Sequence, residues 1–177
     1  MAGTNGKQKT VRDMILSLGL IVLAAYVIYL FIPHDDTEPE TKPVDYRVEL
    51  LTAQRAASYP VAAPEGLPDT WKPTSVRYQG QDGEAWHLGF SAPDGEYVAV
   101  EQSTQARARF IDDTSRGGDE TEVTQDIEGR TWIQYTGGRY SALVLDGADG
   151  SDGSTTMVIG TGSFGQLATM AQALKLD

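Results

Sequence analysis

The chain has 177 residues, a net charge of −11 and no cysteine. A hydrophobic content of 40% excludes a disordered chain and leaves room for one domain of ordinary size with extensions. The acidic balance without a basic stripe excludes nucleic acid as a partner. The absence of cysteine excludes disulfides, so stability must come from apolar burial.

The first 32 residues divide into a basic tail and an apolar run. Residues 1–13 carry three cationic side chains and one acidic side chain, so the rest of the chain has a net charge of −13. Residues 14–32, MILSLGLIVLAAYVIYLFI, contain no charge and no proline. As a helix this run reaches roughly 28 Å, close to the thickness of the bilayer hydrocarbon core. We therefore predict a transmembrane helix in contact with membrane lipid. A buried core helix would show a polar stripe, and a cleaved signal peptide would have a shorter apolar region.

The flanking charges predict the orientation of this helix. Basic residues precede it and acidic residues follow it, so the N-terminus is expected in the cytoplasm. Residues 33–43, PHDDTEPETKP, have no apolar side chain other than proline and are interpreted as a linker. We expect a single-pass protein of the cell membrane with an extracytoplasmic domain over residues 44–177.

The domain is expected to begin with a helix over residues 44–58. Tyr46, Leu50, Ala53 and Ala57 recur at helical spacing and would form one apolar face.

The next segment, YPVAAPEGLPDTWKP at residues 59–73, holds four of the eight prolines. Its prolines exclude a helix interior and a central strand, while its large apolar side chains need burial. We predict an ordered, extended segment with Leu67 and Trp71 inserted at the sheet edge. Backbone groups at such an edge invite a partner, so an unidentified envelope or membrane protein is expected to dock near Tyr59, Leu67 and Trp71.

Turn dipeptides then separate short runs that are rich in aromatic and β-branched residues, a pattern typical of hairpins. The dipeptides are Asp82-Gly83, Asp94-Gly95, Glu128-Gly129 and Gly137-Gly138. Alternation within the runs predicts one wet and one dry face for each strand; His87, for example, lies on the wet face of WHLGFS. The predicted strands, mostly antiparallel neighbours, span residues 74–80, 85–91, 96–102, 121–128, 131–136, 139–146 and 154–161.

Two further helices complete the expected α+β fold. One near residues 104–113 separates the first three strands from the others. The other closes the chain after Ser163, which forms a capping box with Gln166 and precedes an apolar stripe. We predict an antiparallel sheet of about seven strands with helices covering one face.

Several quoted stretches resemble one family. They are PVDY (43–46), YPVAAPEGLPDTW (59–71), WHLGF (86–90), EYVAVEQS (96–103), GRTW (129–132) and GTGSF (160–164). With the basic tail and the apolar run, they resemble actinobacterial single-pass membrane proteins known only as a domain of unknown function. The resemblance implies a location and a bacterial group, and it supplies no catalytic residues.

The sequence offers little catalytic chemistry. GTGSFG, residues 160–165, matches a dinucleotide fingerprint but lacks the later strand and acidic residue, so it is interpreted as a turn into the Ser163 cap. DGADGSDG, residues 146–153, lacks EF-hand spacing and is interpreted as a polar hairpin loop in preference to a weak calcium site. His87 is the single candidate general base outside the linker, and a lone histidine on a wet face is usually a surface residue.

We therefore expect no enzyme, cofactor or metal, and predict a membrane-tethered extracytoplasmic binding or interaction domain, in cell-envelope maintenance or sensing. Two alternatives remain open. A carrier of a lipid or other apolar ligand would need a cavity between sheet and helices. An envelope hydrolase would need two convergent carboxylates in a cleft.

Overall fold

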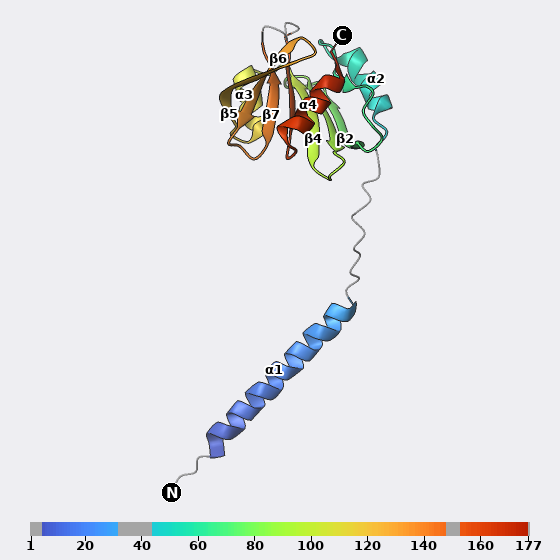
Figure 1. The fold of residues 1–177 in the computed structure, drawn as a ribbon. Helices are drawn as coiled ribbons and strands as arrows, with labels where there is room; N and C mark the ends of the chain where they lie inside the picture. The colour runs from blue at the N-terminus through green and yellow to red at the C-terminus, as the bar shows by residue number, and fades with distance from the viewer. Residues whose placement is uncertain (1–4, 32–43, 148–152, 177) are drawn as a thin grey trace. The chain divides into compact units, whose positions relative to one another are not determined.

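The structure is a computed structural model that describes residues 5–31, 44–147 and 153–176. The chain divides into two compact units, Met1–Glu40 and Thr41–Asp177. In the first unit, helix α1 (Asn5–Phe31) exposes most of its large apolar side chains (Figure 1). Within the described ranges, no helix combines the length and apolar character needed to cross a membrane, so the structure does not support the transmembrane helix predicted for residues 14–32. The linker predicted over residues 33–43 lies outside the described residues.

The second unit is an α+β domain built on one antiparallel sheet, as predicted. Its seven strands lie side by side in the order β2-β3-β4-β8-β7-β6-β5. They are β2 (Lys72–Gln79), β3 (Ala85–Ser91), β4 (Tyr97–Ser103), β5 (Asp119–Ile127), β6 (Arg130–Thr136), β7 (Ser141–Leu145) and β8 (Thr155–Gly160). Strands β2–β4 form one meander and β5–β8 another, and the two meanders join where β4 pairs with β8.

The predicted turn dipeptides all connect neighbouring strands. Glu128 and Gly129 both have positive φ, 53° and 74°, in the two-residue link between β5 and β6. This left-handed pair matches the twist of a tight hairpin. Positive φ also occurs at Asp82 and Gly83 between β2 and β3, and at Gly95 between β3 and β4.

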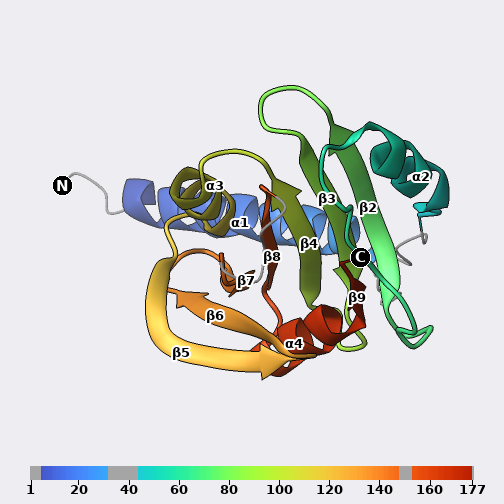
Figure 2. The same ribbon diagram turned by 90° about the horizontal axis from the view of Figure 1, so that it is seen from above.

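Helices pack on both faces of the sheet, which corrects the prediction that they cover one face. Helices α2 (Arg47–Ala56) and α4 (Phe164–Ala173) pack on the face that carries Trp86 and Val158, called the first face below; the opposite face is called the second face. Helix α3 (Arg107–Ser115) packs on the opposite face against Met157 and Ile159. Figure 1 shows α4 in front of the strands and α3 behind them, and Figure 2 shows α2 beside β2.

The assignment of one wet and one dry face is therefore wrong for the central strand β8. All six of its residues are buried, because α4 covers the side chains that point to one side of the strand and α3 covers those that point to the other. A centrally placed strand with cover on both sides has no wet face. The first face nevertheless contains the larger core cluster, including all three tryptophans of the chain.

The two apolar helices on the first face are built as their sequences predict. Tyr46, Leu50 and Ala57 pack against the core around the fully buried Ala53. Helix α4 begins at the predicted capping box, in which the Ser163 hydroxyl accepts the Gln166 N–H and the Gln166 side chain accepts the Ser163 N–H.

The proline-rich segment is ordered, but its middle crosses the first face of the sheet instead of following the edge. The fully buried Gln102 of β4 holds it there: its Oε1 accepts the Ala62 N–H at 2.7 Å and its Nε2 donates to the Pro60 carbonyl at 3.1 Å. The Trp86 indole N–H also donates to the Ala62 carbonyl at 2.9 Å. The segment then forms β1 (Ala63–Pro64), which pairs with β9 (Leu174–Lys175), and reaches the edge strand β2 just after Trp71.

Candidate functional site: a polar pocket on the second face

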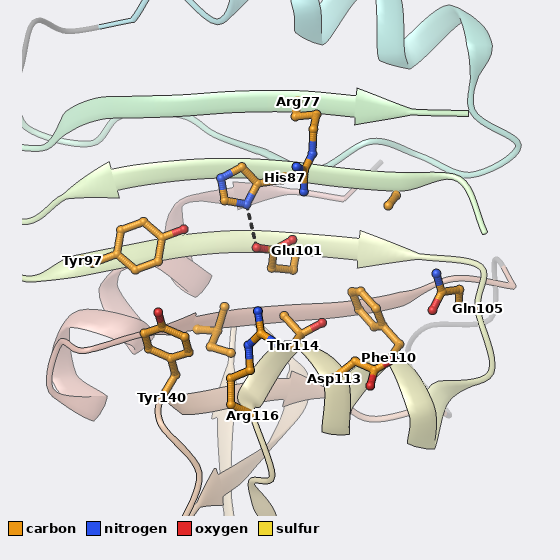
Figure 3. Close-up of a pocket in the computed structure, with 12 residues that line it drawn as sticks. Arg77, His87, Tyr97, Glu101, Gln105, Phe110, Asp113, Thr114, Arg116 and Tyr140 are labelled. Atoms are coloured by element: carbon orange, nitrogen blue, oxygen red, sulfur yellow. Dashed lines mark hydrogen bonds and ion pairs between the residues drawn. The ribbon is translucent and has the colours of Figure 1, made fainter. Parts of the chain in front are cut away.

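A pocket of about 610 Å³ lies on the second face of the sheet, beside helix α3. It exists because α3 packs against the β7–β8 part of this face, while among the described helices of the second unit none packs over β2 and β3 there. Figure 3 shows strand side chains facing side chains of α3 and the segments that flank it. The lining residues are Arg77, Ala85, His87, Tyr97, Glu101, Gln105, Phe110, Asp113, Thr114, Arg116, Tyr140 and Ile159.

His87 lies at the centre of a hydrogen-bonded chain across three adjacent strands. Sheet register places it between Arg77 of β2 and Glu101 of β4. Its Nδ1 lies 2.6 Å from Glu101 Oε1, and its Nε2 lies 2.8 Å from Ser75 Oγ. Because the carboxylate accepts the Nδ1 proton, Nε2 of the neutral ring is left to accept the serine hydroxyl proton. The side chains of His87 and Glu101 are only 18% and 16% exposed, so this histidine is not an ordinary surface residue.

Ser75 is the first residue of β2 in the regular register that also pairs Arg77 with His87. The pairing of β2 with β3 shifts by one residue between Pro73 and Ser75, and Ser75 then pairs with Gly89. A β-carbon at Gly89 would lie 2.4 Å from Ser75 Oγ and 3.0 Å from the Tyr97 ring. The absence of a β-carbon at position 89 leaves the space in which the serine and tyrosine side chains approach each other over β3.

Tyr97 and Tyr140 line one end of the pocket. Their ring centroids lie 6.3 Å apart, and Arg139 lies over the Tyr140 ring. Burial, and to a smaller extent the charge of Glu101, raises the pKa of Tyr97 well above its ordinary value. The Tyr97 phenol is therefore a neutral hydrogen-bond donor throughout the physiological pH range.

The charged side chains of the pocket are unequally paired. Glu101 is bonded to His87, and Asp113 forms an ion pair with Arg109 at 3.5 Å. In contrast, the guanidinium groups of Arg77 and Arg116 form no ion pair or hydrogen bond with any residue that the structure describes. Figure 3 shows these two arginines entering the pocket from opposite walls. The pocket thus contains two cationic groups without a partner among the described residues, in a chain of net charge −11.

The three residues predicted to bind a partner lie on the first face, away from this pocket. Tyr59 and Trp71 are only 4% and 7% exposed and belong to the core cluster, and the partly buried Leu67 packs against it. The Tyr59 hydroxyl donates to the Glu84 carbonyl. The predicted docking of a partner at these residues is not tested by this arrangement, but all three side chains already contact the core.

Sequence reasoning singled out His87 but missed its partners. The side chains of Arg77, His87 and Glu101 lie on the same face of three consecutive predicted strands, opposite the face that carries Trp86. Pairing those strands through their turn dipeptides would have placed the three side chains together. Ser75 shares the alternation of Arg77 and the regular register of the same hairpin, so it could have been placed near His87 in the same way.

Metal ligation finds no support in the described part of the chain, where no three His, Asp or Glu side chains are grouped to hold an ion. Asp149 and Asp152 of the acidic loop lie outside the described residues.

The fold and the pocket define an α+β domain with a seven-stranded antiparallel sheet and a partly buried polar site on one face of that sheet. The chain belongs to the family described as "Protein of unknown function (DUF4245)", whose model matches residues 7–174. No curated protein and no solved structure matches the chain.

Proposed function

We propose that residues 44–177 form a binding domain for a small anionic ligand, which occupies the pocket on the second face of the sheet. The observation that carries this proposal is the pair of arginines, Arg77 and Arg116, that enter the pocket without a carboxylate partner among the described residues. Guanidinium groups bind carboxylate and phosphate through paired charge-assisted hydrogen bonds. A carboxylate or phosphate group of the ligand would lie between them.

The other lining side chains suit a small polar molecule with an apolar part. Phe110, Ile159 and the ring of Tyr140 supply apolar contact, while Gln105 and Thr114 supply hydrogen-bonding groups. A volume of about 610 Å³ lies in the range of small-molecule sites. The predicted alternative of an apolar carrier is less favoured, because burying a hydrocarbon chain here would desolvate the arginines without a compensating partner.

Isothermal titration calorimetry with inorganic phosphate and succinate as probes tests this proposal. Replacing Arg77 or Arg116 with alanine should weaken binding by roughly 10- to 100-fold each, the range expected for a hydrogen bond to a charged group. Arg55→Ala is the matched control, because Arg55 is exposed on α2, which packs on the other face. Failure of both anions to bind, or binding that neither pocket variant weakens, would contradict the proposal.

We also propose that the domain is tethered outside the cytoplasmic membrane by residues 14–32. The support is the uncharged run in the sequence, the basic residues before it, and the exposed apolar side chains of α1, which lipid would cover. The pocket would then face the cell envelope, where maintenance or sensing of the envelope through a membrane partner is the expected role.

Protease treatment of intact protoplasts tests the tether and its orientation. Digestion of the domain from outside, together with a mature protein that retains residues 1–24, is the expected result. A mature N-terminus at Ala25, or a domain that resists protease until the membrane is lysed, would overturn this topology. Solubilised protein that the same protease degrades is the control for intrinsic resistance.

A further inference from the structure

We infer that Ser75 is an activated nucleophile that accepts acyl groups from small esters, with His87 as its general base and Glu101 as the residue that orients the histidine. This inference goes beyond ligand binding, because it assigns a reaction to side chains beside the pocket.

The first support is the order of the hydrogen bonds. A serine hydroxyl lies 2.8 Å from one imidazole nitrogen, and a carboxylate lies 2.6 Å from the other. These are the contacts that convert a serine hydroxyl into a nucleophile, and the arrangement is recognised by geometry and not by fold or chain order. Ser75 lies on the far side of the His87 ring from Glu101, and its side chain is partly exposed.

The second support is that the backbone makes room for this serine. The regular register from Ser75 to Gln79 places Ser75 opposite Gly89, and the missing β-carbon at Gly89 lets the Ser75 hydroxyl lie over β3 beside the Tyr97 ring. Any other residue at position 89 would push its β-carbon to within 2.4 Å of Ser75 Oγ.

The third support is a hydrogen-bond donor near the reacting oxygen. The β-carbon position at Gly89 that lies 2.4 Å from Ser75 Oγ also lies 3.3 Å from the Tyr97 hydroxyl. The two hydroxyls therefore flank the same bare stretch of backbone. A neutral phenol at this place can donate to the oxyanion that forms when an acyl carbon is attacked, a role that tyrosine side chains fill in other sites.

The reaction uses only the ester, water and these side chains. Ser75 Oγ bonds to the carbonyl carbon while its proton moves to His87 Nε2, and the carbonyl electron pair moves to the oxygen facing Tyr97. The tetrahedral species then collapses, the bond from carbon to the alcohol oxygen breaks, and the alcohol leaves with the proton from Nε2. Water repeats both steps on the acyl serine and releases the acid, so that ester and water give acid and alcohol.

The neighbouring arginines indicate which esters would fit. If the proposed function is correct, Arg77 and Arg116 would hold a carboxylate or phosphate group of the substrate, and the ester bond would extend toward Ser75 past the His87 ring. This refinement rests on the proposed anion site, whereas the reactivity of Ser75 does not.

Labelling of the full chain with a fluorophosphonate probe, followed by peptide mass spectrometry, tests the inference. We expect modification of Ser75 at least about 100-fold faster than of Ser75 in urea-unfolded protein, the lower range for general-base assistance. His87→Gln should abolish this acceleration. Ser91→Ala is the matched control, because Ser91 lies on the same strand face as His87 without contacting it.

Two results would overturn the inference. One is folded wild-type protein in which Ser75 reacts no faster than in the unfolded chain. The other is unchanged labelling of Ser75 in His87→Gln, whose folding is checked by tryptophan fluorescence. Labelling of Ser75 that persists in Arg77→Ala would separate the two proposals, because it supports the nucleophile even if phosphate and succinate fail to bind.

Discussion

Gln102 offers the sharpest test of how the proline-rich segment is held on the sheet. Its side chain is fully buried and bonds the segment at two backbone groups, Ala62 N–H and the Pro60 carbonyl, and also donates to Thr156 Oγ1 at 3.0 Å. Gln102→Leu keeps nearly the same volume but removes all three bonds. The substitution therefore isolates the polar contribution of the side chain from its packing.

The expected loss of stability depends on which hydrogen-bonding groups lose the Gln102 side chain as a partner and cannot bond to water instead. Ala62 is fully buried, so its N–H would stay unpaired at a cost of about 1–3 kcal/mol. Thr156 is also buried and would lose a hydrogen bond worth about 1 kcal/mol, whereas Pro60 is exposed and its carbonyl can be hydrated. We expect the free energy of unfolding to fall by about 2–4 kcal/mol.

Urea unfolding followed by tryptophan fluorescence measures this change in the full chain. The three tryptophans all lie in the core of the second unit, so the signal reports on that unit alone. With a slope of about 1–3 kcal/mol per molar urea, the midpoint should fall by roughly 1–2 M. Gln54→Leu, at an exposed position of α2, should change the midpoint little. A Gln102→Leu midpoint within about 0.2 M of wild type at this slope would refute the bonding role assigned to Gln102.

Three further predictions concern packing, capping and titration. Trp71→Ala should lower the free energy of unfolding by about 3–5 kcal/mol in the same assay, as for a buried aromatic, while Glu65→Ala should change little; equal effects would contradict an ordered segment. Ser163→Ala should cost about 0.5–2 kcal/mol through loss of the α4 cap, and Ser163→Asp should restore most of it. Burial and the hydrogen bond to Glu120 raise the pKa of Tyr135 to about 12. The folded state thus favours the neutral phenol, so this contribution to stability is complete below pH 10 and is lost as the pH rises from 10 to about 12. Across that pH window, the melting temperature should fall less steeply for Tyr135→Phe than for the wild type. An identical fall in melting temperature would argue against the raised pKa of Tyr135.

Much of the first face could be predicted because its determinants are local. The turn dipeptides require left-handed backbone at particular residues, as at Glu128 and Gly129, and such a requirement depends on two or three neighbouring positions. The Ser163 cap and the apolar stripe of α2 likewise depend on residues three or four apart. Each of these features is determined by residues within its own segment and does not depend on what the segment packs against.

The second face was decided by contacts between distant parts of the chain. The pairing of β4 with β8 brings together residues more than 50 positions apart and places β8 where helices cover both faces of the sheet. The alternation of residues within β8 therefore could not show that neither side of the strand is exposed to solvent. Helix α3 reaches the second face because the β7–β8 side chains there are apolar, and it stops short of β2 and β3.

The candidate site shows the same division at the scale of single residues. The neighbourhood of His87 and Glu101 follows from the register of one hairpin, which the sequence determines through its turn. The neighbourhood of Ser75, Arg77 and His87 likewise follows from the register of the β2–β3 hairpin, which is regular from Ser75 to Gln79. The sequence does not show that the Ser75 hydroxyl and the Glu101 carboxylate contact the two ring nitrogens of His87, at 2.8 Å and 2.6 Å. These contacts depend on side-chain directions and on the space over Gly89. For that reason the sequence alone indicated a lone histidine, and only the tertiary structure joined it to a serine and a carboxylate.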